Sequence, residues 1–267
     1  MFSKIIDLNN KLISVKSNSQ DLFENLVKDL SPYFFSFINS KQTSKISKIY
    51  TLIYNKNNEY EIYENQNLDY VANDYWDLLA NFEWYLIKDI VHLESAYAKI
   101  HAAVFAKGEK AIVISANKFS GKSLISIKMA ELGYKYLSDE IALINVKTNE
   151  VLPLPRLVVS SYKGYEVIKK NIKNYKKLEV APYIFKLSQR NQKEKTYLKK
   201  VVFFKRARVK ACEFAKISHE AGNRLIRKNS MLPYCKVSLM ESIDFYKFRC
   251  DDFKKIIKTL EAAINER

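Results

Sequence analysis

The chain has no long apolar runs, and its few cysteines show no pairing pattern. The longest uncharged apolar stretches, such as Ala102–Ala106 and Val201–Phe204, are far shorter than the roughly 18 residues that span a bilayer. Cys212, Cys235 and Cys250 are odd in number, and none belongs to a Cys-x-x-Cys pair. We therefore expect no membrane span, no disulfide scaffold and no zinc site, and we expect the thiols to be reduced.

The first residues do not resemble a secretion signal. Their apolar stretch is interrupted by Asp7, Asn9, Asn10 and Lys11. Together with the expected free thiols, this pattern predicts a cytoplasmic protein.

Glycine is also scarce, which makes each glycine informative. The chain has five glycines, and none lies among the first 100 residues. Gly108, Gly121 and Gly133 fall close together, where they suit a turn, a phosphate-binding loop and a helix C-cap. The glycines therefore indicate that the middle of the chain contains tight turns and a loop with special backbone geometry.

The length and the residue patterns predict two regions. The 267 residues, 48% of them apolar, can form one large domain or a small domain fused to a medium one. Aromatic and β-branched runs at 32–39, 48–54 and 59–63 favour strands. Apolar residues from Leu78 to Leu93 recur at helical spacing. We predict a smaller N-terminal α+β region over 1–85 and an α/β core over 86–267.

Within the core, the sequence predicts a hairpin that leads into a loop and a helix. Residues 102–105 and 111–115 favour strands around a turn at 107–110, and further strands are expected at 135–137, 141–146 and 151–152. Helices are expected at 218–232 and 251–263.

Positive charge is concentrated in one segment. The net charge is +16, and residues 163–210 contain sixteen Lys or Arg against three Glu. Such a segment, with aromatic residues interleaved, can hold an acidic peptide, a nucleotide's phosphates or nucleic acid, or be an ordinary solvated surface. No recognition module accompanies the charge, so we expect no nucleic-acid partner.

Residues 116–123 form the most specific motif, a phosphate-binding loop without its first glycine. In such a loop, backbone N–H groups face the phosphates, the lysine reaches the β- and γ-phosphates, and the hydroxyl serves Mg²⁺. We therefore expect Lys122 to contact phosphate and Ser123 to contact the metal. The predicted nucleotide-binding residues are Ala116, Asn117, Lys118, Phe119, Ser120, Gly121, Lys122, Ser123 and Leu124.

Ala116 replaces the first glycine of the motif. Alanine would cost on the order of 1 kcal/mol if its φ were positive there. Phe119 is bulkier than most residues at its position. Because of both features, the chain could also be a protein that binds a nucleotide without hydrolysing it or transferring its phosphate.

Two carboxylates follow the strand that comes after the loop helix. Asp139 and Glu140 lie 17 and 18 residues beyond Lys122. If that strand is parallel and adjacent to the loop strand, its carboxyl end lies near the bound phosphates. One carboxylate could then take a proton from an acceptor hydroxyl while the other holds Mg²⁺.

These motifs, together with His101 upstream and the segment 152–156, resemble the kinase core of the bacterial HPr kinase/phosphorylase superfamily. The likeness is closer to the HPr-kinase-related branch, and it covers roughly residues 76–160. It implies a P-loop HPr-kinase-like core, ATP and Mg²⁺ as cofactors, and phosphorylation of a hydroxyl. It also implies that Asp139 is the general base, that Glu140 lies beside the metal, and that His101 belongs to the active site. Arg156 lies in the family's Pro-x-Pro-Arg pattern and is a candidate substrate contact or a structural ion-pair partner.

The chain departs from the family downstream of the loop, where the glycine-rich signature of true HPr kinases is replaced by the basic segment. HPr is therefore not the expected substrate. We predict an ATP- and Mg²⁺-dependent kinase that acts on serine of another peptide or protein, with acidic acceptors favoured. A small-molecule hydroxyl kinase, acting on an amino acid or sugar, and a non-catalytic nucleotide-binding regulator are the alternatives. The acceptor's identity and the oligomeric state stay open.

Overall fold

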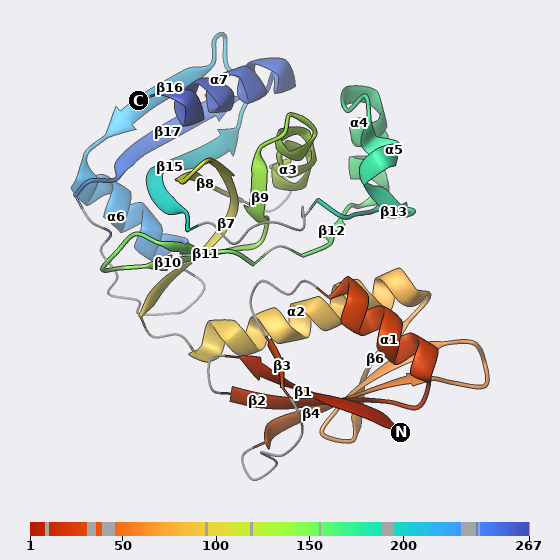
Figure 1. The fold of residues 1–267 in the computed structure, drawn as a ribbon. Coiled ribbons are helices and arrows are strands. Elements are labelled where there is room, and N and C mark those ends of the chain that lie inside the picture. Colours follow the sequence, from red (N-terminus) through yellow and green to blue (C-terminus); the bar gives the residue numbers. More distant parts are fainter. Residues whose placement is uncertain are drawn as a thin grey trace. The chain divides into compact units, whose positions relative to one another are not determined.

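The computed structural model describes two compact units, Met1–Leu93 and Glu94–Arg267. The described residues are 1–8, 11–30, 36–38, 46–93, 96–117, 120–154, 156–187, 195–230, 239 and 241–266. The boundary expected after residue 85 falls inside a helix, Tyr75–Leu93, which belongs wholly to the first unit. The protein is a mixed α/β structure (Figure 1).

The first unit is a six-stranded sheet with two helices. The strand order is β3-β1-β2-β4-β5-β6. Its elements are β1 (Phe2–Leu8), β2 (Lys11–Ser17), α1 (Gln20–Asp29), β3 (Ser36–Ile38), β4 (Ile46–Tyr54), β5 (Tyr60–Glu64), β6 (Asn67–Ala72) and α2 (Tyr75–Leu93). The predicted hairpin of 48–54 with 59–63 is confirmed, since β4 and β5 pair antiparallel. The strand expected at 32–39 is described only as β3, and its other residues lie outside the described part.

The second unit is built on a sheet with strand order β11-β10-β7-β8-β15-β17-β16, with β9 paired to β7. A small sheet of order β12-β14-β13 accompanies it. The strands are β7 (Tyr97–Lys107), β8 (Lys110–Ala116), β9 (Lys135–Ser138), β10 (Ile141–Asn145), β11 (Val151–Leu152), β12 (Val158–Val159), β13 (Glu179–Ala181), β14 (Ile184–Phe185), β15 (Tyr197–Arg206), β16 (Glu213–Ile217) and β17 (Asp244–Cys250). The helices are α3 (Lys122–Glu131), α4 (Tyr162–Asn171), α5 (Tyr175–Leu178), α6 (His219–Lys228) and α7 (Phe253–Asn265).

Both faces of this sheet are buried, as alternate residues of β7 demonstrate. Ala103 and Phe105 pack into a cluster with residues of α3, α4 and α7. Ala102 and Val104 pack into a second cluster that includes Ile226 of α6. Because successive strand residues point to opposite faces, the near-continuous apolar run of β7 is explained by two covered faces. In Figure 1, α3 and α7 lie on one side of the strands and α6 on the other.

The topology corrects one expectation about the strand that carries the carboxylates. β9 is not adjacent to the loop strand β8, because β7 lies between them and pairs antiparallel with both. The parallel neighbour of β8 is β15. β8 and β9 nevertheless run in the same direction, and Ser115 of β8 and Ser138 of β9 pair with Ala102 and Val104 of β7. Both strands therefore end at the same edge of the sheet, about two strand spacings, or roughly 10 Å, apart.

The expectation of three reduced thiols is wrong for two of them. Cys212 and Cys250 form a disulfide, with their Cα atoms 4.6 Å apart. Glu213 of β16 pairs with Arg249 of β17, so the antiparallel register continues directly to these two cysteines. A separation of 38 residues conceals this proximity in the sequence. Cys235 lies outside the described residues.

Among the described residues, no helix combines the length and apolar character that crossing a membrane requires.

Candidate active site

The loop after β8 turns directly into α3 through a left-handed glycine. Gly121 has φ 96° and ψ 19° and is the N-cap of α3. A Cβ there would meet no atom within 4 Å, so it is the backbone conformation, not space, that favours glycine. The amide of Ser120 donates to the carbonyl of Asn117 at 3.3 Å and closes the turn. Lys118 and Phe119, two of the predicted nucleotide-binding residues, lie outside the described part of the chain.

The N-terminus of α3 differs from those of the other long helices. No side chain caps α3. Side-chain oxygens accept from backbone N–H groups at the starts of the other described helices of eight or more residues, and these oxygens belong to Ser19, Asp74, Ser161, Ser218 and Asp252. Because the first N–H groups of a helix need partners, α3 presents donors and a positive dipole end to an anion.

A second polar group at the loop also lacks a partner. The Oγ of Ser120 is buried and makes no hydrogen bond with the described residues. A buried hydroxyl without a partner is uncommon in folded proteins. Together with the uncapped helix start, it fits a loop that is completed by a bound ligand.

Ala116 does not have the backbone conformation that the missing glycine would need. It is the last residue of β8 and pairs in parallel register with Phe204 of β15. Its φ is not among the positive values of the described residues. Its side chain is 7% exposed and belongs to the core cluster of α3 and α7. The condition for the expected strain is therefore not met, because an extended backbone accepts alanine.

Lys122 is buried and folds toward the end of the loop strand. Its Nζ donates to the carbonyl of Ala116 at 2.8 Å and lies 3.4 Å from that of Asn117. These contacts hold a positive charge inside the turn of the loop, beside the N-terminus of α3. Ser123 and Leu124 follow in the first turn of the helix.

Asp139 lies in the connection from β9 to β10 and is 7% exposed. Burial raises the pKa of its carboxyl to about 6, and the nearby charge of Glu140 acts in the same direction. The charges of Arg156 and Lys122 and a hydrogen bond from Tyr136 act against this rise. A carboxyl with such a pKa is ionised at neutral pH and can still accept a proton.

Glu140 pairs with His101. The Nε2 of His101 lies 3.0 Å from Oε2 of Glu140, and the backbone N–H of Ala102 donates to the carbonyl of Glu140. Burial would raise the pKa of the Glu140 carboxyl, but His101, Arg156 and Lys122 together lower it below its usual value. The two neighbouring carboxyls are therefore driven apart in pKa, which is the pattern of a site with distinct acid–base roles.

Tyr136 contacts Asp139, and sequence reasoning missed this contact. Its hydroxyl lies 2.9 Å from Oδ1 of Asp139 and 3.3 Å from the carbonyl of Arg156. The backbone N–H of Leu154 donates to the carbonyl of Leu137, so Leu154 lies beside the end of β9. This strand contact brings Arg156 close enough to affect both carboxyls. The tyrosine gave no signal beyond its place in a predicted strand.

The described residues contain no group of three or more His, Cys, Asp or Glu side chains that could hold a metal ion by themselves. Mg²⁺ at phosphate sites usually keeps several waters and takes only one or two protein ligands besides the phosphates. Ser123 in the first turn of α3 is compatible with that smaller role. Glu140 is engaged with His101 and is 40% exposed at its side chain.

A hollow of about 270 Å³ adjoins the loop. It lies between the start of α3, the end of α4 and the start of α7, and sequence reasoning gave no indication of it. Its lining is apolar where Leu124, Ile125, Val167, Phe253 and Ile256 contribute, and polar where Ser120, Gly121, Lys170, Asn171, Arg206 and Asp251 contribute.

Comparisons with known proteins give a distant structural likeness. No family profile and no curated protein sequence matches the chain. Among solved structures, the Hpr(Ser) kinase/phosphatase from Coxiella burnetii is similar over 62% of this chain and 93% of that one, with 8% sequence identity and a TM-score of 0.33.

Proposed function

We propose that this protein is an ATP- and Mg²⁺-dependent kinase that transfers the γ-phosphate to a hydroxyl group. One observation carries the proposal. The N-terminus of α3 begins at a glycine and has no side-chain cap, and it follows β8 at the same edge of the sheet where β9 leads to the buried carboxyl of Asp139. A phosphate-binding helix start and a carboxyl with a pKa near neutrality are the two parts that phosphoryl transfer to a hydroxyl requires.

The loop would bind the phosphates of ATP. The free N–H groups at the start of α3 would donate to the β- and γ-phosphates, and the Oγ of Ser120 would gain a partner. Lys122 would turn from the carbonyl of Ala116 toward the phosphates and balance the negative charge of the transition state. Bound Mg²⁺, held in part by Ser123, would supply further neutralisation of that charge.

Asp139 would act as the general base. Its carboxylate would accept the proton of the acceptor hydroxyl while the hydroxyl oxygen forms a bond to the γ-phosphorus and the bond to the β–γ bridging oxygen breaks. The Tyr136 hydroxyl, 2.9 Å from Oδ1, would hold the carboxylate in position. His101, fixed by Glu140, would orient the transferred group.

The hollow beside the loop is the proposed place of the nucleoside. Its volume and its apolar walls suit a base, and Leu124 of α3 and Phe253 of α7 both line it. Asp251 and Arg206 at its polar side could contact ribose or base.

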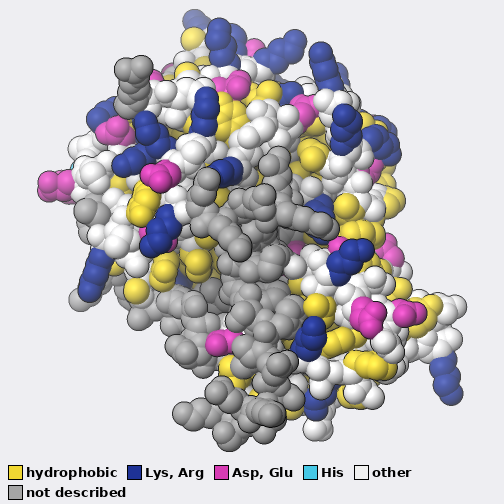
Figure 2. All heavy atoms as spheres, in the orientation of Figure 1, with side chains coloured by type: hydrophobic (Ala, Val, Ile, Leu, Met, Phe, Trp, Pro, Cys, Tyr) yellow, Lys and Arg dark blue, Asp and Glu magenta, His cyan; other side chains and the backbone are white. Residues whose placement is uncertain are grey.

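The acceptor proposed first is serine of an acidic peptide or protein. Lys163, Lys169, Lys170, Lys173, Lys176 and Lys177 belong to α4, α5 and their connection, and α4 also contributes Lys170 to the hollow. Figure 2 shows Lys and Arg side chains over this part of the molecule, with hydrophobic side chains among them. A positive surface beside the loop would attract an acidic acceptor, and this attraction would weaken with salt.

The test is ATP binding and hydrolysis, with and without Mg²⁺, in the wild type and in Asp139→Asn. We expect the wild type to bind ATP and hydrolyse it slowly with Mg²⁺, and we expect the variant to keep binding but lose turnover by about a hundredfold or more. Asp21→Asn, an exposed change in α1, is the control and should change neither property.

Two outcomes would contradict the proposal. Absence of ATP binding would remove the nucleotide site altogether. Tight ATP binding with no hydrolysis and no transfer to any hydroxyl acceptor would leave a nucleotide-binding regulator.

A further inference from the structure

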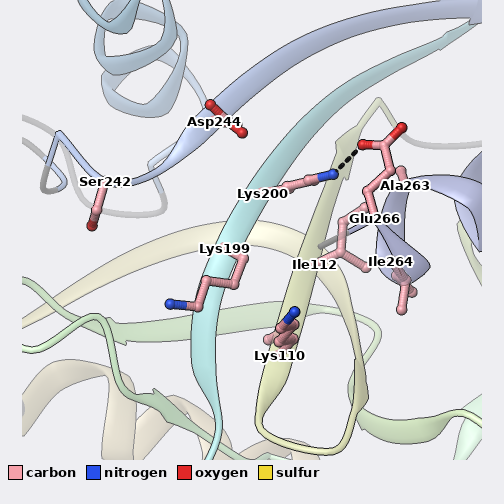
Figure 3. A pocket seen from close by; sticks show the side chains of 10 residues that line it. Lys110, Ile112, Lys199, Lys200, Ser242, Asp244, Ala263, Ile264 and Glu266 are labelled. Atoms are coloured by element: carbon pink, nitrogen blue, oxygen red, sulfur yellow. Dashed lines mark hydrogen bonds and ion pairs between the residues drawn. The ribbon is translucent and has the colours of Figure 1, made fainter.

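A second hollow lies at the other end of the main sheet. It has a volume of about 300 Å³ and is lined at the beginnings of β8, β15 and β17 and at the end of α7 (Figure 3). The phosphate loop follows the opposite end of β8. Since β8 advances about 3.3 Å per residue, the six steps from Lys110 to Ala116 separate the two places by roughly 20 Å.

A β-bulge brings two consecutive lysines to this hollow. Residues that follow one another in a regular strand point to opposite faces. In the pairing of β15 with β8, Leu198 pairs with Ala111 and Lys200 pairs with Ile112, so Lys199 is an extra residue. A bulge redirects side chains, and both Lys199 and Lys200 line the hollow.

The charges of the hollow are only partly balanced. Lys200 forms an ion pair with Glu266, and Asp244 pairs with Lys216 at 2.6 Å. Within the described residues, no ion pair involves Lys110 or Lys199. Figure 3 shows these two side chains on the neighbouring strands β8 and β15, with the single ion pair of the view between Lys200 and Glu266.

Part of the lining is apolar. Ile112 of β8 and Ala263 and Ile264 of α7 contribute to it, and these three belong to the core cluster on one face of the sheet. A ligand that satisfied both features would carry negative charge at one end and a small apolar body at the other.

We propose that this hollow binds a small organic anion with a dianionic head, either a phosphate monoester or a dicarboxylate. The head contacts Lys110 and Lys199, and the apolar body lies against Ile112, Ala263 and Ile264. Two ammonium groups match a dianion, and charge-assisted hydrogen bonds to it are the stronger kind. The site is separate from the proposed nucleotide site and does not depend on it.

The test is calorimetric titration with phenyl phosphate and with phthalate, which separates the two head groups. We expect saturable binding of at least one probe and a loss of about tenfold or more in the double variant Lys110→Gln/Lys199→Gln. Inorganic phosphate, which has no apolar body, should bind more weakly than phenyl phosphate. The matched control is Lys56→Gln/Lys147→Gln, which removes two exposed lysines outside the hollow.

Saturating ATP should leave the affinity for the probe unchanged, because the two sites are far apart. Displacement by ATP would mean that the probe binds the phosphate loop, and this would overturn the inference. Equal affinity in the wild type and in Lys110→Gln/Lys199→Gln would also overturn it, as would the absence of saturable binding for both probes. Lys110 and Lys199 are exposed, so a thermal melt is expected to show an unchanged fold.

Discussion

Buried carboxyls have different hydrogen-bond partners in the two units. In the first unit, Asp89 of α2 is 4% exposed, and each of its oxygens has a donor: Lys48 Nζ at 2.8 Å and the Tyr50 hydroxyl at 3.0 Å. In the second unit, Asp139 is 7% exposed, has the Tyr136 hydroxyl as its close partner, and has a pKa raised to about 6. A carboxyl whose oxygens are matched by donors contributes to structure, whereas one that is buried with fewer donors can take up a proton.

The same contrast holds for lysines and for helix ends. Lys48 contacts Glu64 and Asp89 at 2.9 and 2.8 Å, while Lys122 is held by backbone carbonyls of the loop. α1 begins at a serine cap, and α3 begins at a glycine without a side-chain cap. α3 therefore leaves backbone donors for a ligand, whereas α1 is capped by a serine of its own chain segment.

The largest expected effect is on ATP turnover, and it distinguishes Lys122 from Lys48. Lys122→Met should reduce Mg²⁺-dependent ATP turnover by about a hundredfold or more, because the transition-state charge loses its cation. Lys48→Met should leave turnover per folded molecule unchanged and lower the free energy of unfolding by about 3 kcal/mol, because Asp89 loses its ion-pair partner in a buried place. Turnover measured with purified folded protein and urea unfolding of both variants check this.

Equal losses of turnover in the two lysine variants would contradict the separation. So would a Lys122→Met protein that is as active as the wild type.

The second prediction compares the two carboxyls across pH. The pKa of Asp139 is about 6 in the folded protein against 3.8 for a free side chain, so the folded state binds the proton more tightly. Its contribution to stability is therefore present at low pH and is lost as the pH rises through about 6. Relative to Asp139→Asn, the wild type should lose up to roughly 3 kcal/mol of unfolding free energy between pH 4 and pH 7.

Urea unfolding at several pH values checks this, with Asp89→Asn as the matched variant of the first unit. Asp89→Asn should destabilise the protein at neutral pH, since Lys48 loses its buried partner. The wild-type turnover should rise over the same range in which Asp139 ionises. A stability difference between Asp139→Asn and wild type that does not grow with pH would contradict the assignment.

The smallest effect concerns the missing glycine. Ala116→Gly should lower the free energy of unfolding by about 1 kcal/mol, because it removes a buried methyl group from a strand and adds backbone freedom. ATP affinity and turnover should not change, since Ala116 is extended and paired with Phe204. Thermal melting and ATP titration measure both. An increase in affinity of several-fold would mean that the alanine limits the loop.

Much of the candidate site follows from local patterns. The apolar run before Ala116, the Gly121-Lys122-Ser123 motif and the helical spacing after it predicted β8, the loop and α3. The C-cap of α3 lies one residue earlier than expected: it is Leu132, and Gly133 follows it with φ 86° and donates its N–H to the carbonyl of Ala130. Such features depend on neighbours within a few residues, so the sequence displays them directly.

Other parts depend on strand order, which a single sequence does not display. The insertion of β7 between β8 and β9, the Tyr136 contact to Asp139 and the disulfide of Cys212 with Cys250 all join residues through the sheet. The bulge at Lys199 exists only in the register between β15 and β8. Each of these contacts depends on which strands pair and in which register. Sequences with a similar residue pattern can pair their strands differently.

The local chemistry can be read from residue order alone: a loop that can hold phosphates, two carboxyls after the next strand and a concentrated positive charge. The environment of these groups depends on the folding of the sheet. Folding buried Asp139 at the edge where β8 also ends, engaged Glu140 with His101, and placed Ala116 in extended backbone where its methyl group fills the core. The physical reason is that pKa, burial and ion pairing depend on distances across the sheet, and those distances are set by strand order and register, not by spacing along the chain.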